Sequence, residues 1–319
     1  MGRSCGAAGR SVRLMNDASW IELVDPDADE LRRALPDGVH PSVVERLTEL
    51  RDANARPRLE AQGTYVFGLL LVPTEWGEDH AVTFHQIGLV LNAERLVTAE
   101  HSPDDDKDPL CSAVRNAALR AHDSPSMAVH RLLDEIAERF LSFVDDVDAA
   151  IDELEDHVTE WSSQRIRSEI SGLRHEILHV RRVLTPTRDA ARAVLDDRVE
   201  VEGAELFPRE VEVHFADTYD KLLRATDGLD LSRDLLAGVR DYHQAQVSTE
   251  QNEVMKRLTV VASLLLLPTF IVGLYGQNLK GAPEFGWAHG YAWSWLVIAV
   301  TTVLQLVWFR RKHWIGPAA

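Results

Sequence analysis

Two uncharged, apolar segments near the end of the chain constrain its fold more than any other feature. Residues 258–274 (LTVVASLLLLPTFIVGL) and 291–309 (YAWSWLVIAVTTVLQLVWF) contain no charged side chain. Since a helix rises about 1.5 Å per residue, each segment is long enough to cross the hydrocarbon core of a bilayer. Buried helices of a soluble core are the alternative, but they rarely stay uncharged over this length. We therefore predict a membrane hairpin.

The residues that flank these segments predict their orientation. Lys256 and Arg257 precede the first segment, and a basic tail, residues 310–319, follows the second. Because basic residues favour the cytoplasmic side, we expect a multi-pass protein of the cell inner (plasma) membrane with cytoplasmic N- and C-termini and an external loop at 276–290. Aromatic residues typical of membrane interfaces stand at both ends of the second segment: Trp287, Tyr291, Trp293, Trp295, Trp308 and Trp314.

The rest of the chain is acidic. The protein has 51 Asp and Glu residues against 34 Lys and Arg, which gives a formal net charge of -17. Proteins that bind nucleic acid carry a basic patch, so we expect no nucleic-acid partner, whereas an acidic surface attracts cations. Cys5 and Cys111 have no disulfide or metal-binding spacing, and residues 1–14 have no apolar core of a secretory signal. A cytoplasmic setting is expected for the part before the membrane.

Residues 1–125 are predicted to form an α/β cytoplasmic domain. Short apolar segments are separated by turn residues, and between the first and the second of them DADELRRAL and HPSVVERLTEL have the apolar spacing and start signals of helices. Such segments predict strands: WIELV at 20–24, TYVFGLLLV at 64–72, VTFHQIGLVL at 82–91 and RLVTAE at 95–100.

From residue 126 onward the pattern is helical. Residues 126–205 predict an antiparallel helical part of the cytoplasmic domain, because apolar residues recur at helical spacing among dense charge. So few residues interrupt the next stretch that one helix is predicted there, a stalk at 206–257 that continues into a pore-lining transmembrane helix at 258–275. The second transmembrane helix is predicted at 291–309.

A helix of this length, on the order of 100 Å, needs neighbours to cover its apolar stripe. Self-association around an axis would supply them and would surround a conduit with the first membrane helices. Helical stepping from Asp241 predicts the face that lines it: Ala245, Ser248, Asn252, Met255, Thr259, Ala262, Leu266, Thr269 and Gly273. Hydrated hard cations prefer such amide and hydroxyl oxygens. Ordinary helix packing, in which small and hydroxyl residues let helices approach closely, explains the same spacing equally well.

A known family carries the same motifs. The segment QNEVMKRLTVVASLLLLPTFIVGLYGQNLKGAPEFGWAHGYAW (251–293) resembles the end of CorA-type divalent-cation (magnesium/cobalt) transporters, with Gly-Gln-Asn in place of their Gly-Met-Asn. The resemblance extends to RPRLEAQGTYVFGLLL (56–71) and LRHEILHVRRVLTPTRD (173–189). It implies an α+β membrane protein with a mixed α/β/α cytoplasmic domain, a long stalk helix continuing into the first of two transmembrane helices, and a funnel-shaped homopentamer in the lipid bilayer.

The resemblance also implies roles for individual residues. The ion-selectivity mouth is implied at Tyr275, Gly276, Gln277 and Asn278, and Glu284 would add negative charge outside. Gln277 replaces the usual Met and adds an amide donor and acceptor, so the ion preference can differ from that of the family.

Further residues are implied along the stalk and the pore. The pore and its gate are implied at Asp241, Asn252, Met255, Leu258 and Thr269. An acidic stalk position that helps to bind regulatory metal between subunits is implied at Asp217. The ligand that partners this carboxylate does not follow from the sequence.

These features together predict a passive channel for divalent cations and not an enzyme. The implied activity is magnesium uptake that is driven by the membrane potential and gated by intracellular metal. Mg²⁺ or another divalent cation is both the transported and the regulatory ion, and no catalytic cofactor is expected. Transport of zinc, cobalt or nickel by the same architecture is the near alternative. A membrane-tethered scaffold without transport is a third reading, but it would not need the Tyr-Gly-Gln-Asn motif.

One motif points to a different class of protein. His175, Glu176 and His179 match H-E-x-x-H, in which two histidines on one helix face bind zinc and the glutamate acts as general base. No third ligand follows at the usual offsets, and Arg174, Arg181 and Arg182 would oppose a metal ion. A zinc metalloprotease is therefore the remote alternative.

Overall fold

The structure is a computed structural model that describes residues 19–50, 55–76, 82–101, 110–277 and 287–315. The chain separates into two compact units, residues 1–240 and 241–319. The first unit holds the sheet, the helices before residue 209 and the first part of the longest helix, and the second holds the rest of that helix and the last helix.

One five-stranded sheet forms the centre of the first unit. Its strands lie in the order β1-β5-β4-β3-β2, with β1 parallel to β5 and every other pair antiparallel. The interior strand β5 is buried at every position, and its sequence LVTAE is apolar or small except for Thr98 and Glu100. The strands are β1 (Trp20–Val24), β2 (Arg58–Gln62), β3 (Tyr65–Trp76), β4 (Val82–Leu91) and β5 (Leu96–Glu100).

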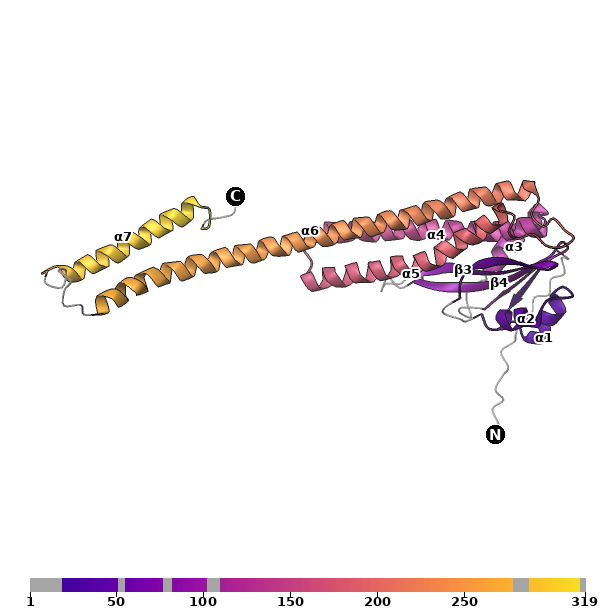
Figure 1. Ribbon diagram of the computed structural model, residues 1–319, viewed down its shortest axis with the longest axis horizontal. Helices are drawn as coiled ribbons and strands as arrows, with labels where there is room; N and C mark the ends of the chain where they lie inside the picture. Colours follow the sequence, from indigo (N-terminus) through magenta and orange to yellow (C-terminus); the bar gives the residue numbers. More distant parts are fainter. Residues whose placement is uncertain (1–18, 51–54, 77–81, 102–109, 278–286, 316–319) are drawn as a thin grey trace, which may run out of the picture. The chain divides into compact units, whose positions relative to one another are not determined.

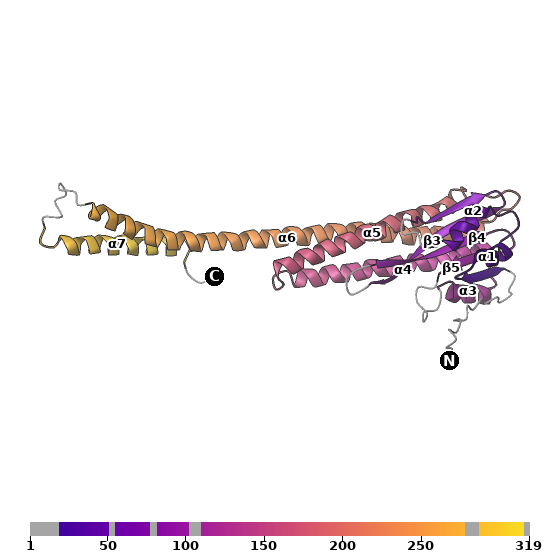
Figure 2. The ribbon, with the colours of Figure 1, turned by 90° about the horizontal axis from the view of Figure 1, so that it is seen from below.

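Helices cover both faces of this sheet (Figures 1 and 2). The short helices α1 (Ala28–Ala34) and α2 (Pro41–Thr48) lie on one face, and the long helices α4 (Pro125–Asp156) and α5 (Ser163–Leu195) lie on the other. Helix α3 (Leu110–Ala121) precedes α4. The resulting α/β/α domain is the one that the resemblance implies.

Local sequence signals fix where these helices begin. Asp27 caps α1 by accepting hydrogen bonds from the backbone N–H groups of Asp29 and Glu30, while the Glu30 carboxylate accepts from the Asp27 N–H, a reciprocal capping box. The hydroxyls of Ser124 and Ser162 accept from backbone N–H groups in the first turns of α4 and α5. Each cap satisfies an N–H that has no partner inside its own helix.

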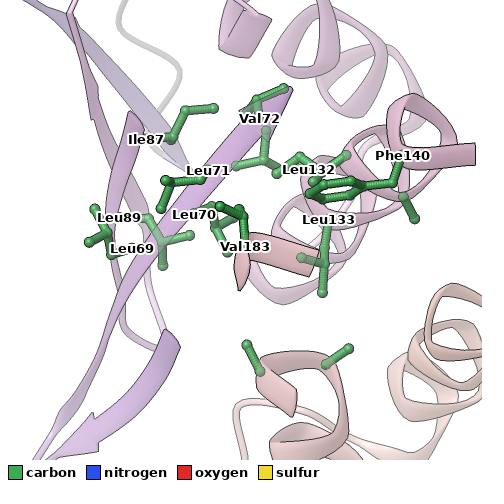
Figure 3. Close-up of a cluster of buried hydrophobic side chains, with 14 of the residues drawn as sticks. Leu69, Leu70, Leu71, Val72, Ile87, Leu89, Leu132, Leu133, Phe140 and Val183 are labelled. Carbon is green, nitrogen blue, oxygen red and sulfur yellow. The ribbon is translucent and has the colours of Figure 1, made fainter. Parts of the chain in front are cut away.

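The core lies between the sheet and the two long helices (Figure 3). Leucines of β3 and β4 meet apolar side chains of α4 and α5, and Leu70, Leu89, Leu132 and Leu133 are fully buried. Gly68 of β3 sits between strand neighbours: a Cβ added there would lie 2.6 Å from Leu59 Cδ2 and 2.7 Å from Leu89 Cγ. Leucine side chains therefore occupy the space that a Gly68 side chain would need.

The last two helices carry the apolar segments. Helix α6 (Arg209–Gly276) is continuous over 68 residues and includes Pro268, and α7 (Gly290–Arg311) has 22 residues. The single long helix predicted from the sequence is thus confirmed. The division of this helix into a stalk and a transmembrane part at residue 257 stays a prediction, as do the other domain boundaries.

The element predictions are confirmed except at two places. The four predicted strands and the two short helices are present, but β2 and α3 were not predicted. The sequence of β2, RLEAQ, has a single buried apolar residue, Leu59, because β2 is an edge strand with a solvated side. Its place in the sheet comes from pairing with β3, which a local pattern does not reveal.

Gly68→Ala should destabilise the full-length protein by about 1–3 kcal/mol, because the new methyl group overpacks Leu59 and Leu89. Gly172→Ala is the matched control, since nothing lies within 4 Å of a Cβ at this helical position, and it should be neutral or stabilise by up to about 1 kcal/mol. Thermal unfolding of both variants in detergent measures the difference. Equal melting temperatures would contradict the packing described for Gly68.

Candidate ion pathway and metal site

The face of α6 that helical stepping predicts as pore-lining is exposed in the single chain. Every one of its stepped positions, from Asp241 to Gly273, is exposed. The apolar members are far from covered, since Met255 is 58% and Leu266 is 73% accessible. One chain therefore leaves this face open to a further partner.

A different face of α6 packs against α7. Val260 and Ile271, which are three helical turns apart, are buried there with exposed fractions of 6% and 8%. The Gln305 side-chain amide of α7 donates a hydrogen bond of 3.4 Å to the backbone carbonyl of Ser263. The hairpin thus uses one face of α6 for its own packing and keeps the predicted pore face free.

The threonines on the open face are oriented by their own helix. The hydroxyl of Thr259 donates to the Met255 carbonyl at 2.8 Å, and that of Thr269 donates to the Leu265 carbonyl at 2.7 Å. Because the proton is used within the helix, the oxygen lone pairs remain available as acceptors. Oxygen acceptors facing a conduit suit a hydrated hard cation.

The most apolar windows of α6 and α7 are largely accessible within the chain. Only 11% of the most apolar window of α6 and 6% of that of α7 are buried within the chain, whereas the core helix of a soluble protein would be mostly buried. The described residues thus contain two helices long and apolar enough to span a bilayer. The exposed face of α7 and the aromatic residues at its ends are consistent with contact to lipid.

The predicted mouth lies only partly within the described residues. Helix α6 ends at Gly276, and Tyr275 and Gly276 line a cavity of about 450 Å³ together with Trp287, Tyr291 and Trp295 from the start of α7. The implied mouth residues Asn278 and Glu284 lie outside the described residues, and Gln277 is the last described residue before them.

Asp217, the implied regulatory residue, lies on an acidic part of α6 beside α4. A cavity of about 620 Å³ here is lined by Asp217 and Asp220 of α6 and by Asp134 of α4. The Lys221 ammonium contacts Asp134 at 2.8 Å and Glu138 at 2.6 Å. Although partial burial opposes it, hydrogen bonding to these two carboxylates raises the pKa of Lys221. Lysine thus compensates two carboxylates of this cluster, and Asp217 remains exposed.

Two histidines border the same cavity. The rings of His130 and His214 lie 5.3 Å apart, and burial lowers the pKa of His130. Among the described residues, no group of three or more His, Cys, Asp or Glu side chains could hold a metal ion.

The H-E-x-x-H motif lies on α5 with its glutamate turned into the domain. The Glu176 carboxylate accepts a hydrogen bond of 3.1 Å from the backbone N–H of Val82, at the start of β4, and is only 9% exposed. The rings of His175 and His179 are 6.5 Å apart, and the ring of His179 packs edge-on against Phe84. Glu176 therefore joins α5 to the sheet, and this geometry does not form a catalytic zinc site.

A buried polar cluster between α3 and the sheet was not predicted. The Glu22 carboxylate accepts from the Ser112 hydroxyl at 2.5 Å and pairs with Arg115 at 3.3 Å. Burial raises the pKa of Glu22 and raises that of the neighbouring Cys111 thiol well above its usual range. The cluster attaches α3 to β1, and no local sequence pattern could have shown this pairing across about 90 residues.

Comparison with known proteins agrees with this geometry. The sequence model of the family described as CorA-like Mg2+ transporter protein matches residues 16–311. The cobalt/magnesium transport protein CorA of Thermotoga maritima is 27% identical over 311 residues, covering 96% of this chain and 86% of that protein. The CorA protein of Methanocaldococcus jannaschii is 25% identical over 307 residues, covering 93% and 91%.

A solved structure shares the fold. The complete structure of the CorA magnesium transporter from Methanocaldococcus jannaschii superimposes with a TM-score of 0.74 at 23% identity and covers 93% of this chain and 91% of that one. The chain therefore shares the fold of a full-length CorA protein.

Glu176→Ala should lower the stability of the full-length protein by about 1–3 kcal/mol, because the buried Val82 N–H loses its acceptor. His175→Ala, at an exposed position of the same motif, should change it by no more than about 0.5 kcal/mol. Chemical unfolding in detergent and the zinc content of the purified protein check both statements. Stoichiometric zinc that disappears in His175→Ala would instead support the metalloprotease alternative.

Proposed function

The chain belongs to the CorA-like Mg2+ transporter family, and from this premise we propose that it assembles into a homo-oligomeric, passive pathway for divalent cations across a membrane. The observation that carries the proposal is the open face of α6, where amide, hydroxyl and thioether groups follow one another without a basic residue. The relatives named above, one of them from Thermotoga maritima, are described as cobalt/magnesium transport proteins. Magnesium is the ion that we propose first.

The chemistry of the pathway suits an ion that keeps part of its water. Mg²⁺ loses its hydration shell reluctantly and prefers oxygen ligands. Asn252 offers an amide oxygen, Thr269 offers a hydroxyl, and Asp241 places a carboxylate at the cytoplasmic end of the same face. Groups of this kind can accept hydrogen bonds from water in the first hydration shell and can thereby select a hydrated cation without stripping it.

The membrane potential is sufficient to drive the ion. One elementary charge gains about 2.3 kcal/mol per 100 mV, so a divalent cation gains roughly twice that amount on moving to the negative side. With both termini in the cytoplasm, the mouth at residues 275–278 faces outward and uptake runs toward the cytoplasmic end of α6. Glu284 would concentrate cations outside this mouth.

We propose five subunits around the axis, as the family resemblance implies. The physical requirement is an assembly in which copies of α6 cover one another, because Leu258, Leu266 and Val261 are exposed by 60%, 73% and 55% in a single chain. A cyclic arrangement closes such contacts and leaves a central conduit.

Regulation is proposed to act at Asp217. A divalent cation held between this carboxylate and a neighbouring subunit would neutralise the repulsion between acidic faces and favour a closed, symmetric assembly. Loss of the ion would release that repulsion and let the α6 helices move. The exposed position of Asp217, beside Asp220 and close to Asp134, is the observation that supports this role.

Selectivity is the least constrained part of the proposal. Gln277 replaces a thioether with an amide in the mouth motif, so zinc, cobalt or nickel could be preferred over magnesium while the pathway stays the same. The uptake experiment below separates these ions.

Full-length protein in proteoliposomes with an inside-negative potential should take up Mg²⁺, and Asn252→Leu should reduce the rate by at least about tenfold, because an apolar constriction dewets and excludes a hydrated ion. Gln251→Leu is the matched control, an equally exposed amide one position away on a different face of α6, and should keep the rate of the parent. Asn278→Ala tests the mouth in the same assay.

The competing outcomes of this assay are distinct. If Zn²⁺, Co²⁺ or Ni²⁺ is taken up but Mg²⁺ is not, the proposed pathway is supported and the changed ion preference is attributed to the mouth residues. Gln277→Met should then restore the preference for Mg²⁺. If no ion is taken up, the alternative of a membrane-tethered scaffold without transport is favoured. An equal loss of rate in Asn252→Leu and Gln251→Leu would contradict the assignment of the pore face.

In Asp217→Asn, the internal Mg²⁺ concentration that slows uptake by half should be at least about fivefold higher than in the parent protein. The reason is that one charged ligand of the regulatory ion is lost from every subunit. Asp234→Asn, another exposed carboxylate of α6, should inhibit like the parent. Uptake rates at a series of internal Mg²⁺ concentrations give both values. An unchanged inhibition curve for Asp217→Asn would place the regulatory ion elsewhere.

A further inference from the structure

Two adjoining cavities form a groove on the first unit, beside the edge of the sheet. The larger has a volume of about 1280 Å³ and the smaller about 320 Å³, and they share Leu50, Ala55, Arg56 and Gln86. The groove exists because β2 pairs with β3 only as far as Leu69, whereas β3 continues to Trp76. A helix, α5, forms its opposite wall.

The groove is cationic in an otherwise acidic protein. Of the described residues that line it, Glu49 alone carries a carboxylate, whereas the whole chain has a net charge of -17. Five arginines and three histidines line it: Arg46, Arg56, Arg58, Arg181, Arg182, His85, His101 and His179. Such a reversal of sign within one cavity calls for an anionic occupant.

Several of these side chains are already positioned by contacts within the domain. Arg181 forms an ion pair with Asp230, and His85 lies 3.0 Å from the Glu100 carboxylate. The guanidinium groups of Arg46 and Arg58 lie 5.9 Å and 5.6 Å from the centre of the Phe67 ring. The contacts of Arg46 and Arg58 with Phe67 hold two guanidinium groups in place before any ligand arrives, which reduces the entropy that binding would cost.

Other guanidinium groups in the groove keep donors that make no hydrogen bond within the described part of the chain. Arg56 and Arg182 are exposed, and neither forms an ion pair within the described part of the chain. The Nε–H of Arg58 is shielded from solvent and makes no hydrogen bond among the described residues, although Glu60 Oε1 lies 3.6 Å from this nitrogen as an ion-pair partner. An anion in the groove would supply a closer acceptor for this shielded N–H.

The larger cavity also has an apolar side. Phe84 is half buried with its ring edge-on to His179 at 5.2 Å, and Leu178 and Pro186 of α5 lie along the same wall. A cavity with a cationic end and an apolar wall suits a ligand that joins phosphates to a flat, weakly polar group. Pockets that bind small ligands usually have volumes of about 300–1000 Å³. The volume of the larger cavity is therefore sufficient for a nucleotide.

We propose that this groove binds a polyphosphate, in the form of a nucleoside polyphosphate. The planar guanidinium groups of Arg56 and Arg182 match phosphate oxygens in bidentate geometry. Arg58 adds the shielded donor, and the apolar wall receives the base. The site is separate from the ion pathway and from Asp217, so it does not rest on the transport activity proposed above.

The test is calorimetric titration of the purified full-length protein, in detergent and EDTA, with ATP, inorganic triphosphate and adenosine. ATP should bind with a dissociation constant below about 1 mM, and adenosine should not bind. The double variant Arg56→Glu with Arg182→Glu should weaken ATP at least about tenfold, because two phosphate donors become carboxylates. Arg167→Glu, on the same helix about four turns before Arg182 and outside both cavities, is the charge-matched control and should bind like the parent.

Two results would support a polyphosphate site. If ATP binds more tightly than triphosphate, the apolar wall contacts the base, and if both bind with equal affinity, the site recognises the phosphates alone. The proposal is overturned if ATP at about 5 mM does not bind, or if Arg167→Glu weakens ATP binding as much as the double variant does. Absence of binding counts against the proposal even where an acidic face of a second copy covers the groove. If the double variant does not fold, Arg56→Gln with Arg182→Gln replaces it, and unchanged ATP affinity there overturns the proposal as well.

Discussion

The open face of α6 between residues 241 and 273 is the constraint on which the rest of the structure depends. It leaves Met255 and Leu266, which water does not favour, uncovered in a single chain, and it carries the amide of Asn252 and the hydroxyl of Thr269 along the same stripe. Apolar and polar groups on one stripe require different surroundings. In the proposed assembly, copies of the same face around an axis would meet both requirements, because apolar side chains would contact neighbours while amides and hydroxyls would turn toward water in the centre. The proposed oligomer and the proposed conduit therefore follow from the same packing requirement.

The part of α6 that precedes residue 240 is held in a different way. Apolar side chains such as Leu222 and Leu229 are fully buried and supply most of the favourable free energy. The polar links to α4, which run from Lys221 to Asp134 and from Ser232 to Asp148, and the link from Asp230 to Arg181 of α5 are partly exposed and each contribute little. Their effect is on register: they favour one axial position of α6 against the other long helices.

The sequence revealed the features that repeat along the chain and missed those that depend on distant pairing. Uncharged runs, helical periodicity and alternating strands predicted the hairpin, the long α6 and four of five strands. The edge strand β2 and the pair of Glu22 with Arg115 depend on partners far away in sequence, and no local pattern records them. The stepped pore face was predicted as a set, and its exposure is observed, but its role as a pore, like those of Asp217 and the mouth residues, stays a prediction that transport experiments decide.

Helix α5 offers a physical route between the cationic groove and the long helix. Arg181 lines the groove and forms a two-pronged contact with Asp230 of α6, and Arg182 follows it directly. A polyphosphate in the groove would compete with Asp230 for the Arg181 guanidinium, because phosphate carries more charge and accepts the same bidentate geometry. Loss of that ion pair would remove one of the links that set the axial position of α6. Occupancy of the groove would then bias α6, the helix whose far end carries the proposed gate, without any contact between ligand and ion.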